Sequence, residues 1–148
     1  MRVYLGSDHA GFELKAQVAD VLRDLGHDVV DIGPYTDESV DYPDYAERVA
    51  RAVASGEAPF GVLICGTGIG MAIAANKVPG IRAVQASDPE MAKMARMHNN
   101  ANILTLPGRY IDKERAAEVL SVFLSTPFEG GRHQRRIDKI GQIEQSAE

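Results

Sequence analysis

The residues with the clearest chemical potential are a cysteine and the glycines that follow it. Cys65 opens the run Cys65-Gly66-Thr67-Gly68-Ile69-Gly70, in which three glycines occupy every second position. Glycines at this spacing before a helix let several backbone N–H groups turn inward as an anion-binding nest. A thiol beside such a nest is accessible as a reactive thiolate, although a buried cysteine that acts as a small apolar residue is the plainer interpretation. Thr67 could donate a hydrogen bond to a ligand or cap the helix.

Three known phosphate-binding loops do not fit this run. A dinucleotide-binding loop needs Gly-x-Gly-x-x-Gly after the first strand and a later acidic residue, whereas this loop has other spacing and follows the third predicted strand. A nucleoside triphosphate loop ends in Gly-Lys-Ser/Thr, which does not occur here. A cysteine phosphatase loop needs an arginine six residues after the thiol, where this chain has Met71. The sequence therefore disfavours all three.

Acidic, imidazole and guanidinium side chains follow other predicted strands. Asp8 and His9 come directly after the first strand, and Arg109 follows the fifth. The helix after the fourth strand ends near His98, and a histidine at a helix C-terminus keeps its proton more readily, which suits a general acid. A turn hydrogen bond for His9 and a capping charge for His98 are the plain alternatives. We expect these groups to gather with Cys65 at one edge of the sheet, as in an active site.

The C-terminal tail carries the basic run Arg132-His133-Gln134-Arg135-Arg136. Arg132 and Arg136 are one helical turn apart and could hold one phosphate together, although a solvated face is the default interpretation. A net charge of −5 and few aromatic residues argue against nucleic acid or an anionic membrane as partner. No metal site is predicted, because the sequence has no His-Glu-x-x-His motif, cysteine pair or acidic ligand cluster.

Strands and amphipathic helices must alternate to position these groups. Short apolar runs predict five strands, at 3–5, 29–32, 62–64, 82–84 and 102–104. Apolar residues at helical spacing predict helices over 14–25, 42–53 and 116–124, and Asp88-Pro89 begins another. The series predicts a single-domain, Rossmann-like α/β sandwich of three layers with a five-stranded parallel sheet, whose ligands bind beyond the carboxyl ends of the strands. A short basic helix is expected after Gly130-Gly131, within a C-terminal tail over 128–148.

Length and composition indicate one ordinary globular domain. The chain has 148 residues, of which 45% are hydrophobic and 25% charged, enough for one core. Cys65 is the only cysteine, so no intrachain disulfide can form and a reducing compartment is expected. No apolar stretch approaches the ~20 residues of a membrane span, and the first residues lack the apolar core of a signal peptide. The sequence thus predicts a soluble cytoplasmic protein of one domain, 1–148.

Five motifs together resemble the type B ribose-5-phosphate isomerases, a family that also includes allose-6-phosphate and galactose-6-phosphate isomerases. In chain order they are Asp8-His9-Ala10-Gly11, the run from Cys65 to Met71, Ala75-Asn76-Lys77, His98-Asn99-Asn100 and the basic run of the tail. The glycine loop and the His-Asn-Asn motif are quite specific in combination. The resemblance implies a homodimer, possible also as a dimer of dimers, with no metal or cofactor and with active sites at the subunit boundary.

The resemblance also implies catalytic roles. The counterpart of Cys65 moves a proton between carbons 1 and 2 of the sugar. The backbone from Gly66 to Gly70, which includes Gly68, and the Thr67 side chain face the enediolate oxygens. The counterpart of His98, with that of Asp8, opens the sugar ring. One branch of the family lacks the cysteine and uses a glutamate in the helix turn below, but that position is Met71 here, so the thiol route is the one available.

Further positions of the resemblance concern binding. The phosphate-binding positions are His9, Arg109, and Arg132 and Arg136 of the partner subunit. Tyr42 and Asn99 match residues that line the sugar. The basic tail is therefore expected to pack on the partner. Because every member of the set is present, a homodimer should be self-sufficient, which disfavours the galactose-6-phosphate enzymes that divide these residues between unlike subunits.

The resulting prediction is an aldose–ketose isomerase that interconverts ribose 5-phosphate and ribulose 5-phosphate through an enediolate, in the pentose phosphate pathway. Allose 6-phosphate is the main rival substrate and a four-carbon phosphate is conceivable, because pocket depth does not follow from the sequence. A non-catalytic module that binds a phosphosugar or nucleotide would explain the nest and the arginines but gives the thiol no task. A cysteine hydrolase would need an ordered Cys–His pair.

Overall fold

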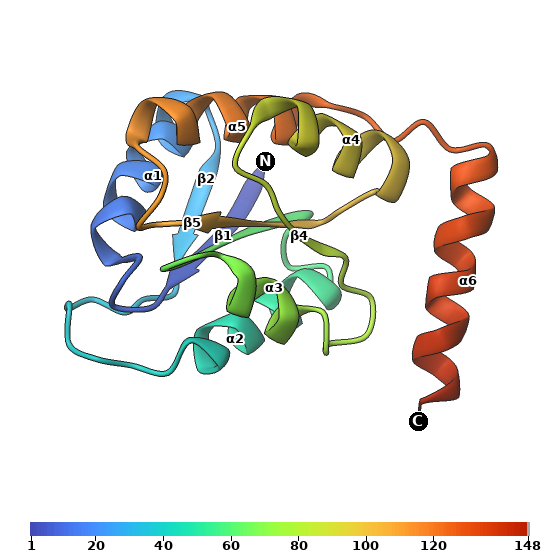
Figure 1. Cartoon of the computed structure of the whole chain (residues 1–148), viewed down its shortest axis with the longest axis horizontal. Coiled ribbons are helices and arrows are strands. Elements are labelled where there is room, and N and C mark those ends of the chain that lie inside the picture. Colours follow the sequence, from blue (N-terminus) through green and yellow to red (C-terminus); the bar gives the residue numbers. More distant parts are fainter. Residues whose placement is uncertain (148) are drawn as a thin grey trace.

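One sheet of five parallel strands runs through the middle of the molecule (Figure 1). The computed structural model describes residues 1–147. The strands are β1 (Arg2–Ser7), β2 (Asp28–Asp31), β3 (Phe60–Cys65), β4 (Ala83–Gln85) and β5 (Ile103–Pro107), in the order β2-β1-β3-β5-β4. The helices are α1 (Phe12–Asp24), α2 (Tyr42–Ala54), α3 (Ile69–Ala75), α4 (Pro89–Asn99), α5 (Lys113–Ser125) and α6 (Arg132–Ser146). The predicted α/β sandwich with a five-stranded parallel sheet and a C-terminal helix is confirmed.

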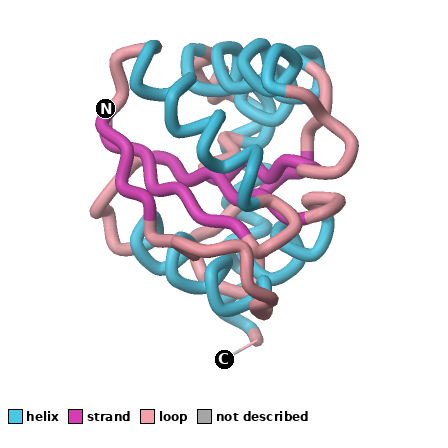
Figure 2. The backbone as a smooth tube through the Cα atoms, turned by 90° about the vertical axis from the view of Figure 1, so that its left-hand side faces the viewer, coloured by secondary structure: helices cyan, strands magenta, loops and turns pink. Residues whose placement is uncertain are grey.

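Apolar side chains on both faces of the sheet form two cores. Val62 and Leu104 pack with α1, α4 and α5 on one face, whereas Leu63 and Ile103 pack with α2 and α3 on the other. Figure 2 shows helices above and below the strands in this way. Because parallel strands are covered on both faces, their sequences are short continuous apolar runs, which is why all five strands could be located. None of the helices within residues 1–147 is long and apolar enough to cross a bilayer.

The helix ends follow the local rules on which their prediction depended. The Asp88 carboxylate accepts a hydrogen bond from the Met91 N–H at 3.0 Å, and Pro89 occupies the first helical position of α4. After α1 the chain turns at Gly26, whose φ of +88° lies in the left-handed region that favours glycine. These caps fix where each helix begins and ends, and hence which residues lie at the edges of the sheet.

Helix α6 differs from the short basic helix expected for the tail. It spans 15 residues and stands beside the sheet layers rather than within them (Figure 1). Two of its residues, His133 and Ile137, are buried against the body of the chain. Near its other end, the Glu144 carboxylate accepts a hydrogen bond from the Gly80 N–H at 3.1 Å. The helix is thus held at both ends while much of its length remains exposed.

A buried arginine fixes the end of α4. The Arg96 guanidinium lies 4.8 Å from the centre of the Phe60 ring and 5.9 Å from that of Phe123. It donates hydrogen bonds to the carbonyl oxygen of Ala101 at 2.6 Å and to that of Thr126 at 3.2 Å. Arg96 therefore ties the last turn of α4 to the start of β5 and to the end of α5.

Replacing Arg96 with methionine is expected to lower the free energy of unfolding by about 3 kcal/mol, because buried carbonyl oxygens lose a charged donor. The methionine keeps much of the apolar stem, so the loss reports mainly on the hydrogen bonds. Urea unfolding at one fixed protein concentration measures the difference. The matched control is Arg23→Met, since Arg23 is exposed and forms only a surface ion pair with Asp20, for which a change below about 0.5 kcal/mol is expected. Equal stability of the two variants would contradict the assignment.

Candidate active site

In the turn after β3, the backbone carbonyl groups are held on the side that faces β4 and β5. The carbonyl oxygens of residues 65–68 each accept a hydrogen bond of 2.7–3.1 Å from β4, from β5 or from the turn after β5. The donors are the backbone N–H groups of Gly108 and Arg109, the Gln85 side-chain amide and the Thr105 hydroxyl. A trans peptide sets its N–H opposite its C=O, so the N–H groups of residues 66–69 point away from β5. The N–H groups of the turn thus share the orientation that the predicted backbone nest requires.

The Cys65 thiol lies on the N–H side of this turn. Its sulfur accepts a hydrogen bond from the Gly68 N–H at 3.2 Å. Gly68 has a φ of +76°, in the left-handed region, which lets the chain turn back toward the sulfur without the steric cost of a side chain. Cys65 is only 5% exposed and belongs to the core beneath α2 and α3. The cysteine is thus both buried, as the plain interpretation held, and bonded to the nest, as a catalytic group would be.

Two side chains lie against the glycines of the turn. A methyl group added to Gly70 would come within 2.7 Å of the Tyr42 ring, and one added to Gly66 would come within 3.2 Å of the Arg109 guanidinium. Tyr42 and Arg109 therefore flank the turn closely, where a ligand in the nest would meet them. The Thr67 hydroxyl accepts a hydrogen bond from the N–H of Ile69, the first residue of α3, at 3.2 Å, while its own proton stays available to a ligand.

The loop after β1 packs directly on β3 next to Cys65. The Asp8 N–H donates to the Ile64 carbonyl oxygen at 3.1 Å, and the buried Asp8 carboxylate accepts from the Gly11 N–H at 3.0 Å. Gly11 is needed here, because a Cβ at this position would lie 2.5 Å from the Ile64 carbonyl oxygen. Asp8, and with it the loop that carries His9, is thus held beside the thiol.

His9 is exposed and is bonded to a distant segment, not to its own turn. Its Nδ1 accepts a hydrogen bond from the Val40 N–H at 3.2 Å. Because Nδ1 is an acceptor, the ring proton of the neutral imidazole is on Nε2, which can donate to an anion. We call the group at this edge of the sheet the thiol cluster: Asp8, His9, Tyr42, Cys65, Gly66, Thr67, Gly68, Gly70 and Arg109.

The other predicted site residues lie at the opposite edge. Helix α4 runs back from the carboxyl end of β4 to the amino end of β5, so its last residues, His98 and Asn99, lie at the amino edge of the sheet. Arg82, which directly precedes β4, donates to the Asn99 carbonyl oxygen at 3.0 Å. The expectation that His98 gathers with Cys65 at one sheet edge is therefore wrong within a single chain. The returning helix is the physical reason.

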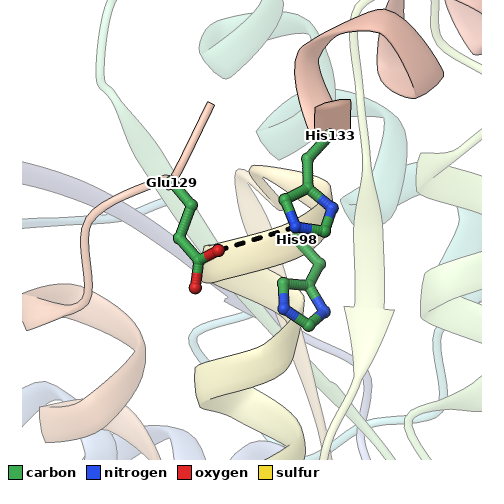
Figure 3. A group of neighbouring side chains, drawn as sticks. All are labelled: His98, Glu129 and His133. Carbon is green, nitrogen blue, oxygen red and sulfur yellow. Dashed lines mark ion pairs between the residues drawn. The ribbon is translucent and has the colours of Figure 1, made fainter. Parts of the chain in front are cut away.

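The start of α6 lies beside His98. The rings of His98 and His133 stack with centroids 4.3 Å apart and planes 12° apart (Figure 3). The exposed Arg132 and Arg136 belong to the same part of α6. We call this group the histidine cluster: His98, Asn99, Glu129, Arg132, His133 and Arg136.

His133 and Glu129 received no role from the sequence. The Glu129 carboxylate lies 3.5 Å from the His133 Nε2, and His133 is only 7% exposed. Burial is the main cause that lowers the pKa of His133, and the neighbouring His98, Arg132 and Arg136 lower it further, against Glu129. The neutral imidazole is therefore favoured near pH 7. Glu129 lies in the turn before α6, so its four-residue spacing from His133 is not a helical one, and no sequence pattern signalled the contact.

A cleft of about 710 Å³ borders the histidine cluster, between α6 and the edge of the sheet at β4. Its lining includes Arg82 and Asn99 on the body and Ile140 and Ile143 on α6. Ile143 is 68% exposed and Ile140 is 42% exposed. The inner side of α6 thus presents apolar side chains that this chain leaves uncovered.

Comparison with known proteins decides the family. The family model described as Ribose/Galactose Isomerase matches residues 3–140. The chain belongs to this family. It is 46% identical to ribose-5-phosphate isomerase B of Escherichia coli over 144 residues, which are 97% of each chain. It is 47% identical to the putative sugar phosphate isomerase YwlF of Bacillus subtilis over 98% of each chain.

The family fold extends over the whole molecule. The solved structure of ribose-5-phosphate isomerase B from Clostridium thermocellum superposes with a TM-score of 0.98 at 49% identity, and the match covers 100% of both chains. Complete coverage means that α6, although it stands apart from the sheet layers, is placed alike in the two proteins. The backbone arrangement that separates the thiol and histidine clusters in this chain is therefore shared with that structure.

Proposed function

We propose that this chain is a metal-independent ribose-5-phosphate isomerase of the pentose phosphate pathway, which interconverts ribose 5-phosphate and ribulose 5-phosphate. The observation that carries the proposal is the Cys65 sulfur, bonded at 3.2 Å to an N–H of the backbone nest. Such an arrangement puts a base beside donors that can stabilise an oxyanion. The names of the E. coli and C. thermocellum relatives favour ribose 5-phosphate as substrate.

The thiol cluster would carry the proton transfer. The Cys65 thiolate removes the proton from carbon 2 of the open-chain aldose and leaves a cis-enediolate. The thiol, whose proton exchanges with solvent, then delivers a proton to carbon 1, while a proton passes from oxygen 2 to oxygen 1, so that oxygen 2 becomes the carbonyl oxygen of the ketose and oxygen 1 its hydroxyl. The N–H groups of residues 66 and 67 and the Thr67 hydroxyl would face the enediolate oxygens, and each such donor contributes about 3 kcal/mol in comparable sites. The N–H groups of residues 68 and 69 already donate to Cys65 and Thr67. Because the carbonyl groups of the turn are fixed by hydrogen bonds from β4, β5 and the turn after β5, these donors need no rearrangement during the reaction.

A complete site would need both clusters, and the two lie at opposite edges of one chain. We therefore propose a homodimer in which the thiol cluster of one chain faces the histidine cluster of the other. His9 and Arg109 would bind the phosphate with Arg132 and Arg136 of the partner subunit. Asp8 would act with His98 of the partner subunit to open the ring. Tyr42 and Asn99 of the partner subunit would line the sugar.

The tail supports this assembly. The cleft beside α6 and the exposed Ile140 and Ile143 provide an apolar surface of the kind that subunits cover. A partner chain packed against the tail, residues 128–148, would also bring that chain's loops toward the histidine cluster. The whole chain, 1–148, would form a single isomerase domain that includes this tail. Glu148 itself lies outside the described residues. A dimer of such dimers is compatible with the same surface.

Incubation with EDTA and ribose 5-phosphate in heavy water tests the reaction. NMR is expected to show ribulose 5-phosphate with deuterium on carbon 1, because the proton held by the thiol exchanges with solvent. The rate should match that of untreated enzyme, since no step of the proposed reaction uses a metal. Loss of activity in EDTA that added metal restores would contradict metal independence. A protein that binds sugar phosphates but converts none of them would instead be a binding module.

The sugar is tested in the same assay. Comparison of kcat/KM for ribose 5-phosphate and allose 6-phosphate should favour the five-carbon substrate. A higher value for allose 6-phosphate would keep the mechanism and change the substrate.

A further inference from the structure

Three side chains of the histidine cluster converge on one point. His98 comes from α4, His133 from α6, and Glu129 from the turn between α5 and α6 (Figure 3). One potential metal-ligand atom from each lies within 4.8 Å of those of the other two. Within residues 1–147 this is the only such group of three histidine, cysteine, aspartate or glutamate side chains. Its stacked histidines have no task in the proton transfer at Cys65.

We propose that His98, Glu129 and His133 form a binding site for a transition-metal ion with affinity for nitrogen, such as Zn²⁺, Ni²⁺ or Cu²⁺. Two imidazoles and one carboxylate are a ligand set that zinc accepts, with its fourth position open to water or to a ligand. Imidazole nitrogen suits these ions, whereas Mg²⁺ and Ca²⁺ prefer sites made of oxygen atoms. The chemistry of the donors therefore selects the class of ion.

Binding of an ion requires the three ligand atoms to move closer together. Metal–nitrogen bonds of about 2.0–2.1 Å in a tetrahedral site place neighbouring ligand atoms about 3.3 Å apart. The Glu129 oxygen and the His133 Nε2 are already 3.5 Å apart. The widest separation in the group, at most 4.8 Å, must close by about 1.5 Å.

One histidine ring must also turn. The planes of His98 and His133 are only 12° apart, and a metal ion has to lie close to the plane of each ring that binds it. A rotation about the Cβ–Cγ bond of one ring would aim both nitrogens at a common point, and this torsion is broad in histidine. His98 is only half-buried, which leaves it room for the rotation. Glu129 is exposed and can follow.

The surrounding charges sharpen the selectivity. Glu129 supplies one negative charge, whereas Arg132 and Arg136 on α6 oppose a cation. Weakly bound hard ions would therefore be excluded, and only ions that bind strongly to imidazole would remain.

Occupation of the site would have a consequence for catalysis that rests on the proposed function. The ion would take a ring nitrogen of His98, the group proposed to protonate the sugar ring oxygen. The enzyme would then be inhibited by the ion and restored by a chelator. Transition metal would thus act on this enzyme as an inhibitor, not as a cofactor.

Binding can be measured without any activity assay. The full-length protein, treated with EDTA and desalted, is titrated with Co²⁺, whose visible absorption reports a four-coordinate site, and Zn²⁺ is then added as competitor. We expect one Co²⁺ per chain, displaced by Zn²⁺ but not by Mg²⁺. His133→Gln and Glu129→Gln should each weaken binding at least tenfold. His27→Gln and Glu118→Gln, which change the same residue types outside the cluster, should leave it unchanged.

Two outcomes would overturn the proposal. One is binding that is equally tight in the wild type and in Glu129→Gln, a variant that changes an exposed side chain and should fold normally. The other is binding that disappears in Cys65→Ser but persists in His133→Gln, because the ion would then be on the thiol. Neither outcome bears on the proposed isomerase, whose activity is measured separately in EDTA.

Discussion

Replacing Cys65 with serine is expected to lower kcat/KM for ribose 5-phosphate by about 10³-fold, within the range that loss of a general base produces. Serine is close in shape to cysteine and its oxygen can accept the same hydrogen bond from the Gly68 N–H, so the turn should keep its conformation. A serine hydroxyl, however, holds its proton too tightly to act as a base at neutral pH. Steady-state kinetics measures the loss, and NMR should show that deuterium no longer exchanges at carbon 2 of the aldose.

The control for this variant is Met71→Leu. Met71 is fully buried in the same core as Cys65, and a volume-conserving change there costs little stability. Its kcat/KM should stay within about threefold of the wild type. A Cys65→Ser protein as active as Met71→Leu would remove the thiol from the mechanism. A serine variant that fails to unfold cooperatively would be replaced by Cys65→Ala, for which the same loss is expected.

Mixing two inactive variants is expected to restore about one quarter of wild-type activity, provided that one change is in each cluster. Cys65→Ala and His98→Gln are a suitable pair. In a twofold symmetric dimer each site takes the thiol cluster from one chain and the histidine cluster from the other. A mixed dimer therefore has one site with both changes and one intact site. Random exchange makes about half of all dimers mixed, so about a quarter of all sites become intact.

The pairing of variants provides the control. His98→Gln mixed with Arg136→Ala should recover no activity, because both changes lie in the histidine cluster and no intact site can form. Subunit exchange has to be shown independently, for example by mass spectrometry of differently tagged chains. If exchange occurs and the Cys65→Ala and His98→Gln mixture stays inactive, the proposed assembly is wrong. Rescue in both mixtures would mean that His98 and Arg136 of one chain serve two different active sites. That result would contradict their placement in one histidine cluster.

The sequence predicted well what depends on strand ends. Asp8 directly follows β1, Cys65 is the last residue of β3, and Arg109 lies two residues after β5. Parallel strands bring their carboxyl ends to one edge, so these groups were placed together correctly. His98 was misplaced because it ends a helix, and a helix that connects parallel strands carries the chain back to the opposite edge. The error came from counting a helix end as a strand end.

Other features depend on contacts between distant segments, which a single sequence does not display. Arg96 looks like any charged residue of an amphipathic helix, and only the approach of Phe60 and Phe123 makes it a buried structural group. The stack of His98 on His133 requires α6 to return to the end of α4. The helix of the tail was expected to be short, whereas two buried residues and the Glu144 contact hold a helix of 15 residues.

The turn after β3 has a consequence for how this family can vary. Its N–H groups belong to the main chain, and they are aimed by partners behind them in β4 and β5, among them Thr105 and Gln85. Most substitutions in the turn itself cannot delete a main-chain donor, so the donors that we propose for the reacting oxygens are insulated from point mutation. The side chains around it, such as Tyr42, remain free to change with the length of the sugar. A family described by both ribose and galactose can therefore vary the side chains around this turn while keeping its main-chain donors.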